Sequence, residues 1–282
     1  MSSVPSPTIR RRSRPLPIRV EIGRQLRRRR TQGIFGFLVV LPVILWAAFT
    51  IGGNDDPSAA PGFVDLAQES GANLVVFALF ASTGFLFIVV TALFAGDTVP
   101  SEASWSSLRY LLTAPVRRGR LLRQKILVAI LSTVVALVFL PLWTLLVGGV
   151  AYGWGSYVGP TGDQLSLRTF LVRLVVIVVY LLLNLAQVGA IAFALGVWTD
   201  APLAAVGGAV LIMIVFLILD SITALGSIRQ GFPGHYAFAW ADALAPEVVW
   251  SQMAQGALWS VGWTVLLLSV AVWHFLRKDV TS

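Results

Sequence analysis

Few side chains in this sequence combine a chemically useful group with an unusual position, and the clearest are polar residues within long apolar runs. Asn184 and Gln187 lie three residues apart, so a helix places both amides on one face. Asp220 stands near the end of the next apolar run. Polar groups in such runs are candidates for a substrate pathway. For the two amides we favour hydrogen bonding between helices, which contributes only about 0.6 kcal/mol on average; Asp220 could also be solvated near lipid headgroups.

Residues that support catalysis or metal binding are scarce. Cysteine is absent, which excludes disulfides and thiolate metal sites. The two histidines, His235 and His274, are far apart, and we interpret His235 as an ordinary loop residue rather than a metal ligand. The sequence contains no G-x-x-x-x-G-K-[ST] motif for nucleotide phosphates. We therefore expect no catalytic residue, no metal site and no cofactor in this chain.

The elements that carry these residues are predicted to be membrane-spanning helices. Of the 282 residues, 57% are hydrophobic and 12% are charged, about half the charged fraction of a soluble domain. The predicted fold is all-α and polytopic, with a transmembrane domain over residues 33–282. A span needs about 20 apolar residues, and six runs satisfy this criterion: 34–52, 74–95, 126–150, 171–198, 203–225 and 257–276.

Three details of the spans can be anticipated. Pro42 and Pro141 lie inside the first and third spans and are expected to kink them. The third and fourth spans are long enough to tilt or to extend beyond the hydrocarbon. Gly149-x-x-x-Gly153 matches a small-residue packing motif but falls at the end of a span, where the motif means little.

Charge predicts the orientation. Eighteen of the 21 Lys and Arg residues form three clusters: ten arginines within residues 1–30, six basic residues within 109–125, and the pair Arg277 and Lys278. The 53–73 loop instead carries four acidic residues and no basic one. The positive-inside rule then puts both chain ends and the 96–125 loop in the cytoplasm, and indicates a multi-pass protein of the cell inner or plasma membrane.

The turn at 199–202 is the weakest point of this topology. An even number of spans makes it an inner turn, yet it contains no basic residue. The fourth and fifth runs could instead form one broken re-entrant element. Their lengths favour two crossings.

The N-terminal region is predicted to have two parts. Residues 1–16, with Pro5, Pro7 and Pro15, are expected to be a disordered basic tail. Residues 17–32 form a basic amphipathic pattern, which predicts an interfacial helix lying on anionic lipids of the inner leaflet. The alternative is a simple orientation anchor. The clustered basic charge therefore indicates a membrane surface rather than nucleic acid as the partner.

The cytoplasmic loop between the second and third spans is predicted to contain a short helix over residues 101–114. Glu102 suits the positive end of a helix that Ser101 would cap. Trp105, Leu108 and Leu112 then form one apolar stripe. Such a stripe could dock into a partner through its tryptophan, or the loop could only place its arginines among headgroups.

The same segment resembles the signature of the permease subunits of ABC-2 type exporters. The motif there is a glutamate, a Gly-Thr-Leu, a Leu-Leu pair, a Pro-Val, an arginine and a lysine. The corresponding residues here are Glu102, Ser106-Ser107-Leu108, Leu111-Leu112, Pro115-Val116, Arg118 and Lys125. Ser106 and Ser107 depart from the usual glycine and threonine, but both are small. Residues 20–31 and 275–280 are also similar to the connecting helix and the chain end of bacterial members.

This resemblance implies a function and partners. Permeases of that family have no ATPase of their own and pair as two transmembrane halves with two nucleotide-binding subunits, which bind the ATP and Mg²⁺. The 101–114 helix would correspond to their coupling helix, and the residues that would contact the ATPase are Glu102, Trp105, Ser106, Leu108, Leu112 and Arg118. The second permease is expected to be another copy of this chain. Family substrates are lipid-like, hydrophobic or drug-like molecules, or polymers, and the family's counterpart of the 226–256 loop dips into the outer leaflet.

Two other function classes are weaker. A secondary transporter is expected to show an inverted repeat and broken helices, and the sequence has no clear internal repeat. A membrane-embedded enzyme needs intramembrane pairs of His, Glu or Asp residues, and none is visible in the apolar runs.

Overall fold

The architecture is a bundle of long helices, seen in a computed structural model that describes residues 23, 25, 27–52, 62–96, 118–199 and 201–277. Among these residues, six helical segments are long and apolar enough to cross a membrane. They are α2 (Arg29–Ile51), the continuous α4–η1–α5 segment (Gly71–Ala81, Ser82–Leu86 and Phe87–Gly96), α8 (Arg118–Tyr152), α9 (Leu167–Thr199), α10 (Pro202–Asp220) and α11 (Trp250–Arg277). The predicted count of six spans in a helical membrane protein is confirmed.

Short elements connect these helices. They are α3 (Phe63–Gln68), the two-residue strands β1 (Tyr157–Val158) and β2 (Gln164–Leu165), and the 3₁₀ segments η2 (Thr223–Gly231) and η3 (Ala239–Leu244). The strands pair antiparallel, Tyr157 opposite Leu165. This hairpin is a small departure from the all-α expectation.

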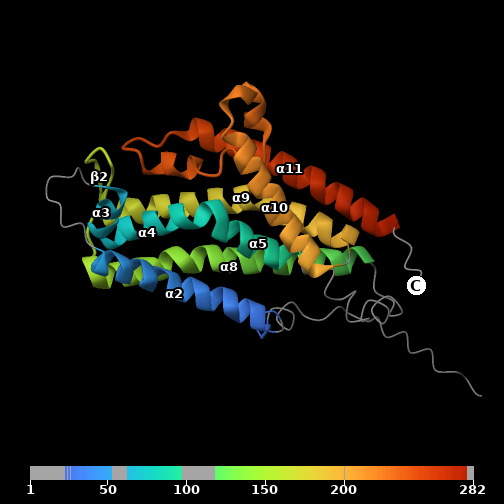
Figure 1. The fold of residues 1–282 in the computed structure, drawn as a ribbon, viewed down its shortest axis with the longest axis horizontal. Helices are drawn as coiled ribbons and strands as arrows, with labels where there is room; N and C mark the ends of the chain where they lie inside the picture. The colour runs from blue at the N-terminus through green and yellow to red at the C-terminus, as the bar shows by residue number, and fades with distance from the viewer. Residues whose placement is uncertain are drawn as a thin grey trace, which may run out of the picture.

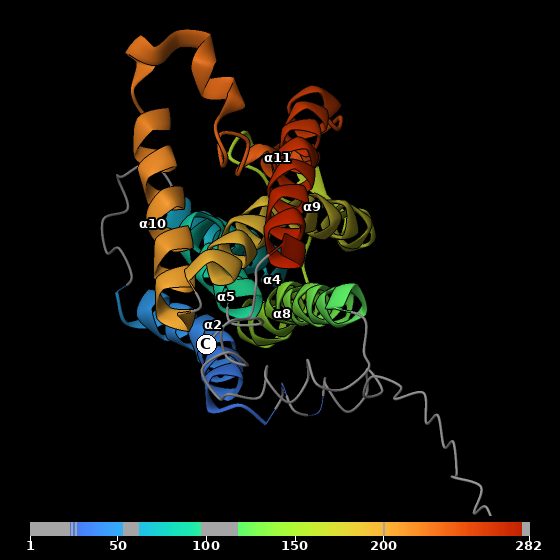
Figure 2. The ribbon, with the colours of Figure 1, turned by 90° about the vertical axis from the view of Figure 1, so that its right-hand side faces the viewer.

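The bundle is organised around α9. This helix packs against α11, α5 and α10, while α8 lies along α4 and α2. Figure 1 shows that α2 and α8 start, and α11 finishes, at one end of the bundle, which we call the basic end after Arg29, Arg118 and Arg277. The opposite end carries α3 and the β hairpin and is called the hairpin end. Figure 2 shows the η2–η3 segment arching from α10 to α11.

The fourth and fifth predicted spans are two separate helices. α9 ends at Thr199 and α10 begins at Pro202, where proline at the first helical position costs no hydrogen bond. Each of the two helices is long and apolar enough to cross a membrane by itself, which favours two crossings over one broken element.

Several boundaries differ from the predicted ranges. Residues 29–32, assigned from sequence to the interfacial helix, continue directly into α2. α10 ends at Asp220, because Ser221 turns back to donate to the Ile218 carbonyl. α11 begins at Trp250 rather than near 257, since its added first turns bury Met253 and Gly256. Residues 1–16 and the 101–114 helix lie outside the described residues.

Proline is accommodated inside two of the spanning helices. α2 runs through Pro42 and α8 through Pro141 without an interruption of the helix. Close to Pro42, the indole Nε1 of Trp143 on α8 donates to the Val39 carbonyl at 2.9 Å. A neighbouring helix thus supplies a donor where proline disturbs the backbone ladder, as membrane helices require.

Glycines allow the backbones of α4 and α8 to approach closely at the hairpin end. A Cβ atom on Gly71 would lie 2.6 Å from the Gly149 nitrogen, and one on Gly148 would lie 2.9 Å from the Gly71 Cα. The Gly71 N–H also donates to the Gly153 carbonyl at 3.0 Å, where Gly153 has a left-handed φ of 91°. The Gly149-x-x-x-Gly153 motif, which the sequence alone did not mark as a packing site, therefore lies at a contact between two helices.

Candidate functional site

The predicted coupling residues cannot be placed. Glu102, Trp105, Ser106, Leu108 and Leu112 lie outside the described residues, between α5 and α8. Arg118 is the first residue of α8, and only its backbone is described. Their assignment to a partner contact stays a prediction.

The two amides of α9 lie at a helix interface. Asn184 and Gln187 are 5% and 2% exposed, and Nδ2 of Asn184 donates to Oγ of Ser260 on α11 at 3.3 Å. Neither amide lines the two cavities described below. This arrangement favours the interpretation as interhelical bonding over a role in a substrate pathway.

Asp220 has a partner that the sequence did not indicate. Its Oδ1 lies 2.5 Å from Nδ1 of His235, beyond η2, and both side chains are about a quarter exposed at 24% and 22%. Arg229 donates to the Asp220 carbonyl at 2.9 Å. These contacts tie the η2 turn to the end of α10, so Asp220 anchors a loop. In the part of the chain that the structure describes, no cluster of three His, Cys, Asp or Glu residues could hold a metal ion.

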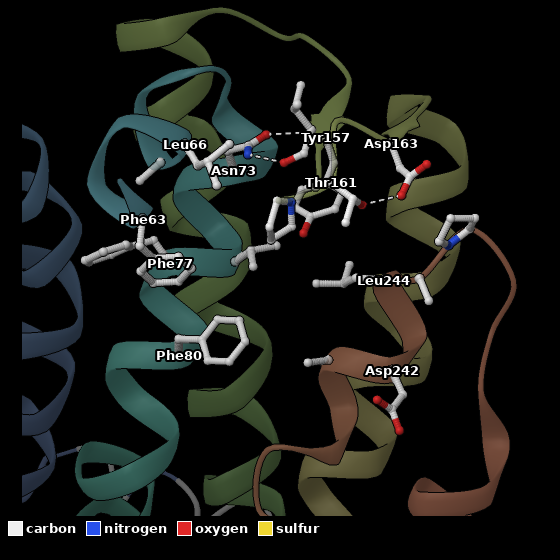
Figure 3. A pocket seen from close by; sticks show the side chains of 18 residues that line it. Phe63, Leu66, Asn73, Phe77, Phe80, Tyr157, Thr161, Asp163, Asp242 and Leu244 are labelled. Atoms are coloured by element: carbon white, nitrogen blue, oxygen red, sulfur yellow. Dashed lines mark hydrogen bonds between the residues drawn. The ribbon is translucent and has the colours of Figure 1, made fainter. Parts of the chain in front are cut away.

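One cavity lies at the hairpin end, and we call it the hairpin-end cavity. It has a volume of about 520 Å³ and is walled by α3 and α4 on one side, η3 on the other, and the β hairpin above (Figure 3). This volume falls within the range of small-molecule sites, about 300–1,000 Å³. Three segments that are far apart in sequence thus meet around one space.

An amide fixes the hairpin above the cavity. Asn73, 4% exposed on α4, donates through Nδ2 to the Val158 carbonyl at 2.8 Å and accepts from the Val158 N–H at 2.9 Å (Figure 3). Ser70 caps the start of α4 and donates to Oδ1 of Asn73 at 3.0 Å. The side chain of Asn73 therefore pairs with β1 as a strand backbone would.

A turn then brings an acidic side chain to the rim. The Gly159 N–H donates to the Asp163 carbonyl at 2.7 Å, and Gly162 provides a left-handed φ of 84°. Oγ1 of Thr161 donates to Oδ2 of Asp163 at 2.5 Å. The Asp163 carboxylate is thereby held beside Thr161 at the upper side of the cavity in Figure 3.

The opposite wall is held by an arginine and a tryptophan. Arg173 on α9 donates to the carbonyls of Ala243 at 3.1 Å and Pro246 at 2.9 Å, and also to that of Ala245. Trp240 is fully buried, with its ring centroid 4.5 Å from that of Phe80. These contacts hold η3 against the bundle, so that this segment forms one wall of the cavity.

The lining combines aromatic rings with two carboxylates. Phe63 packs on Phe77 and Phe80, with centroids 5.1 and 5.4 Å apart. Burial raises the pKa of the Tyr157 hydroxyl above its ordinary value, so this ring is neutral at physiological pH. Oδ2 of Asp242 is enclosed and has no hydrogen-bond partner among the described residues. The cavity can thus offer hydrophobic surface and negative charge together.

A second, lateral cavity of about 300 Å³ lies between α5, α8, α9 and α11. Its lining is apolar, with aliphatic side chains and Phe193, apart from a few hydroxyl groups such as those of Thr91 and Thr133. The Thr133 hydroxyl donates to the Ala129 carbonyl, whereas the Thr91 hydroxyl is buried without a partner among the described residues. Its surface matches the interior of a membrane, and the described residues that line it include no charged group.

Sequence reasoning missed the cavity for identifiable reasons. Asn73 lies one residue before the predicted start of the second span, where an amide side chain is expected to belong to the end of a loop. Asp242 and Glu247 are the acidic residues of the aromatic-rich 226–256 loop. Acidic side chains in such an apolar segment were the sequence feature that could have indicated a site there. No periodicity could have indicated that this loop meets α4.

The fold and its apolar helices define a polytopic, helical membrane protein. Within that class, residues 37–281 match the family described as "Protein of unknown function (DUF2705)", and the chain belongs to this family. A search of curated proteins finds no match. The family description assigns no activity, so the function must be argued from the molecule itself.

Proposed function

We propose that this protein is the membrane-spanning permease subunit of an ATP-driven ABC-2 type exporter. A separate nucleotide-binding subunit binds ATP and Mg²⁺ and drives the permease through the 101–114 helix. The observation that carries the proposal is that α5 ends and α8 begins at the basic end, the same end at which α2 begins and α11 ends. The 101–114 helix belongs to the sequence that joins α5 to α8.

The distribution of charge supports an orientation with the basic end in the cytoplasm. Arg29, Arg30, Arg123 and Lys125 lie toward the basic end of α2 and α8, and Arg277 closes α11 there. The hairpin end instead carries more acidic than basic residues: Asp65, Glu69, Asp163, Asp242 and Glu247 against Arg168 and Arg173. Basic residues favour the cytoplasmic side, so an ATPase would meet the 101–114 helix.

The helices that flank the loop suit the transmission of a conformational change. α8 is one helix of 35 residues, about 50 Å long at 1.5 Å per residue. It runs from Arg118 at the basic end to Tyr152 and packs along the preceding α4–η1–α5 segment, which runs in the opposite direction. A displacement of the 101–114 helix would therefore act on two packed helices that reach the hairpin end, where the hairpin-end cavity lies.

The outward faces of the bundle leave room for lipid and for a second copy of the chain. α2, α10 and α11 are each only 17% buried over their most apolar stretches. Leu203 and Leu211 on α10 are 85% and 61% exposed. Such apolar surface must be covered by acyl chains or by another permease, and it is compatible with the proposed dimer of two transmembrane halves.

The proposed placement of ATP hydrolysis on a separate subunit can be tested directly. The purified chain alone is expected to hydrolyse no ATP, because the phosphate-binding motif is absent from its sequence. Co-expressed with a candidate nucleotide-binding ATPase from the same genome, the chain is expected to co-purify as a complex with ATP turnover. Turnover is measured by phosphate release in lipid nanodiscs.

The control is the same complex with the catalytic glutamate of the ATPase replaced by glutamine, which should retain assembly and lose turnover. Steady ATP turnover by the isolated chain would contradict the proposal. So would failure of a folded chain to associate with that ATPase.

A further inference from the structure

The lateral cavity between α5, α8, α9 and α11 opens on the outer surface of the bundle, whose helices Figure 2 shows from the basic end. Two of its lining side chains are exposed, Ile130 on α8 at 54% and Leu183 on α9 at 38%. The rest of the described lining is buried or partly buried and consists of apolar residues and threonines. Because these helices are apolar enough to span a membrane, the cavity opens toward acyl chains rather than toward water.

The lateral cavity lies in the half of the membrane next to the basic end. On α8 its lining extends from Ile126 to Val134, about 12 Å along the axis at 1.5 Å per residue. Arg123 lies one turn nearer the basic end, so Val134 is about 16 Å further along the helix than this arginine. One leaflet contributes about 15 Å of hydrocarbon, half of the bilayer core. A lipid with its headgroup at Arg123 would therefore have its acyl chains at the depth of the cavity.

Arg123 is positioned to bind such a headgroup. It shares the face of α8 that lines the cavity, because Ile126 follows it after three residues and Ile130 after four more. Cβ atoms at these spacings are about 5–6 Å apart. The side chain of Arg123 is exposed, and its guanidinium has no hydrogen-bond or ion-pair partner among the described residues. Since a guanidinium can donate two parallel hydrogen bonds to one phosphate, Arg123 provides the charged group that the cavity itself lacks.

We propose that the lateral cavity and Arg123 together form a binding site for one anionic phospholipid of the leaflet at the basic end. An acyl chain enters past Ile130 and Leu183 and fills the cavity, and the phosphate accepts hydrogen bonds from the Arg123 guanidinium. A zwitterionic lipid carries a cationic group of its own beside the phosphate and binds more weakly. The site requires neither ATP nor the ATPase partner, so lipid binding and the proposed export function can succeed or fail separately.

The test uses native mass spectrometry of the purified full-length chain, which counts bound lipids one at a time. The probes are dioleoyl phosphatidylglycerol and dioleoyl phosphatidylcholine, which have the same acyl chains and differ in headgroup charge. The first phosphatidylglycerol is expected to bind at least about fivefold more tightly than the first phosphatidylcholine, the factor that one basic residue near anionic headgroups provides. Arg123→Gln is expected to remove most of this preference, and Arg123→Lys, which keeps the charge, is expected to retain it.

The chain of the lipid is tested by Ala186→Phe, which adds a ring to the cavity lining and is expected to weaken binding of phosphatidylglycerol about fivefold or more. Ala186→Leu replaces it if the larger ring lowers the yield of folded protein.

Two variants are matched controls. Arg29→Gln removes an exposed arginine of α2 at the same end of the bundle, and Ala204→Phe adds a ring at an exposed position of α10. Both should leave the affinity for phosphatidylglycerol unchanged. Equal affinities of the native chain for the two lipids would overturn the proposal. So would a loss in Arg29→Gln as large as that in Arg123→Gln, or unchanged phosphatidylglycerol binding by a folded variant at Ala186.

Discussion

Gly71→Ala is expected to destabilise the protein by about 2–3 kcal/mol, the upper range for an overpacked contact. The new Cβ would lie 2.6 Å from the Gly149 nitrogen and 3.0 Å from the Gly148 carbonyl carbon. Both neighbours are backbone atoms of α8, so no side chain can rotate away. The contact opens only if α4 and α8 separate, which also weakens the bond from Gly71 to the Gly153 carbonyl.

Gly207→Ala in α10 is the control for Gly71→Ala. A Cβ atom there meets nothing within 4 Å, and alanine favours a helix over glycine by roughly 0.5–1 kcal/mol. The two alanines should therefore shift stability in opposite directions. Thermal unfolding in detergent, followed by circular dichroism, measures both. Equal midpoints for the two variants would show that the glycine contact between α4 and α8 is not close-packed.

Trp105→Asp is expected to weaken association with the ATPase by more than about 30-fold. Trp105 is the largest residue of the apolar stripe predicted over 101–114, and loss of a central tryptophan commonly costs 2 kcal/mol or more at an interface. The introduced charge adds a desolvation penalty. The measurement is the dissociation constant of the complex in nanodiscs by biolayer interferometry.

Ala103→Asp introduces the same charge two residues earlier, on the opposite face of the predicted helix. It should change the affinity by less than about threefold. If Ala103→Asp and Trp105→Asp weaken the complex equally, the apolar stripe is not the docking surface, and a general effect of charge on the loop would account for the loss.

The parts of the fold that the sequence predicted depend on local properties. A run of about 20 apolar residues marks a span wherever it packs, which is why six helices were found and why α9 and α10 could be separated by their lengths. Boundaries were less predictable because they depend on contacts. Trp250 to Gly256 is helical in α11, where Gly256 lies against Tyr180 and Tyr236, and neither contact is visible in the sequence.

The candidate site was predicted less well, because it depends on residues distant in sequence. Asn73 is hydrogen-bonded to Val158, and Asp220 is hydrogen-bonded to His235. Phe80 and residues of η3 line the same cavity. A single sequence contains no signal for such pairs. The amides at 184 and 187 were correctly placed on one face of a helix, since three-residue spacing is a local property.

The most direct test of the proposed function is a cross-link from the loop between α5 and α8. The chain has no cysteine, so Ser104→Cys introduces a single thiol for a photoactivatable maleimide, and Ser156→Cys places one on the exposed hairpin end as control. In membranes with the co-expressed ATPase, Ser104→Cys is expected to give a covalent adduct with the ATPase and Ser156→Cys none. No adduct from Ser104→Cys in a complex that still turns over ATP, or an equal adduct from Ser156→Cys, would contradict the assignment of this loop as the ATPase contact.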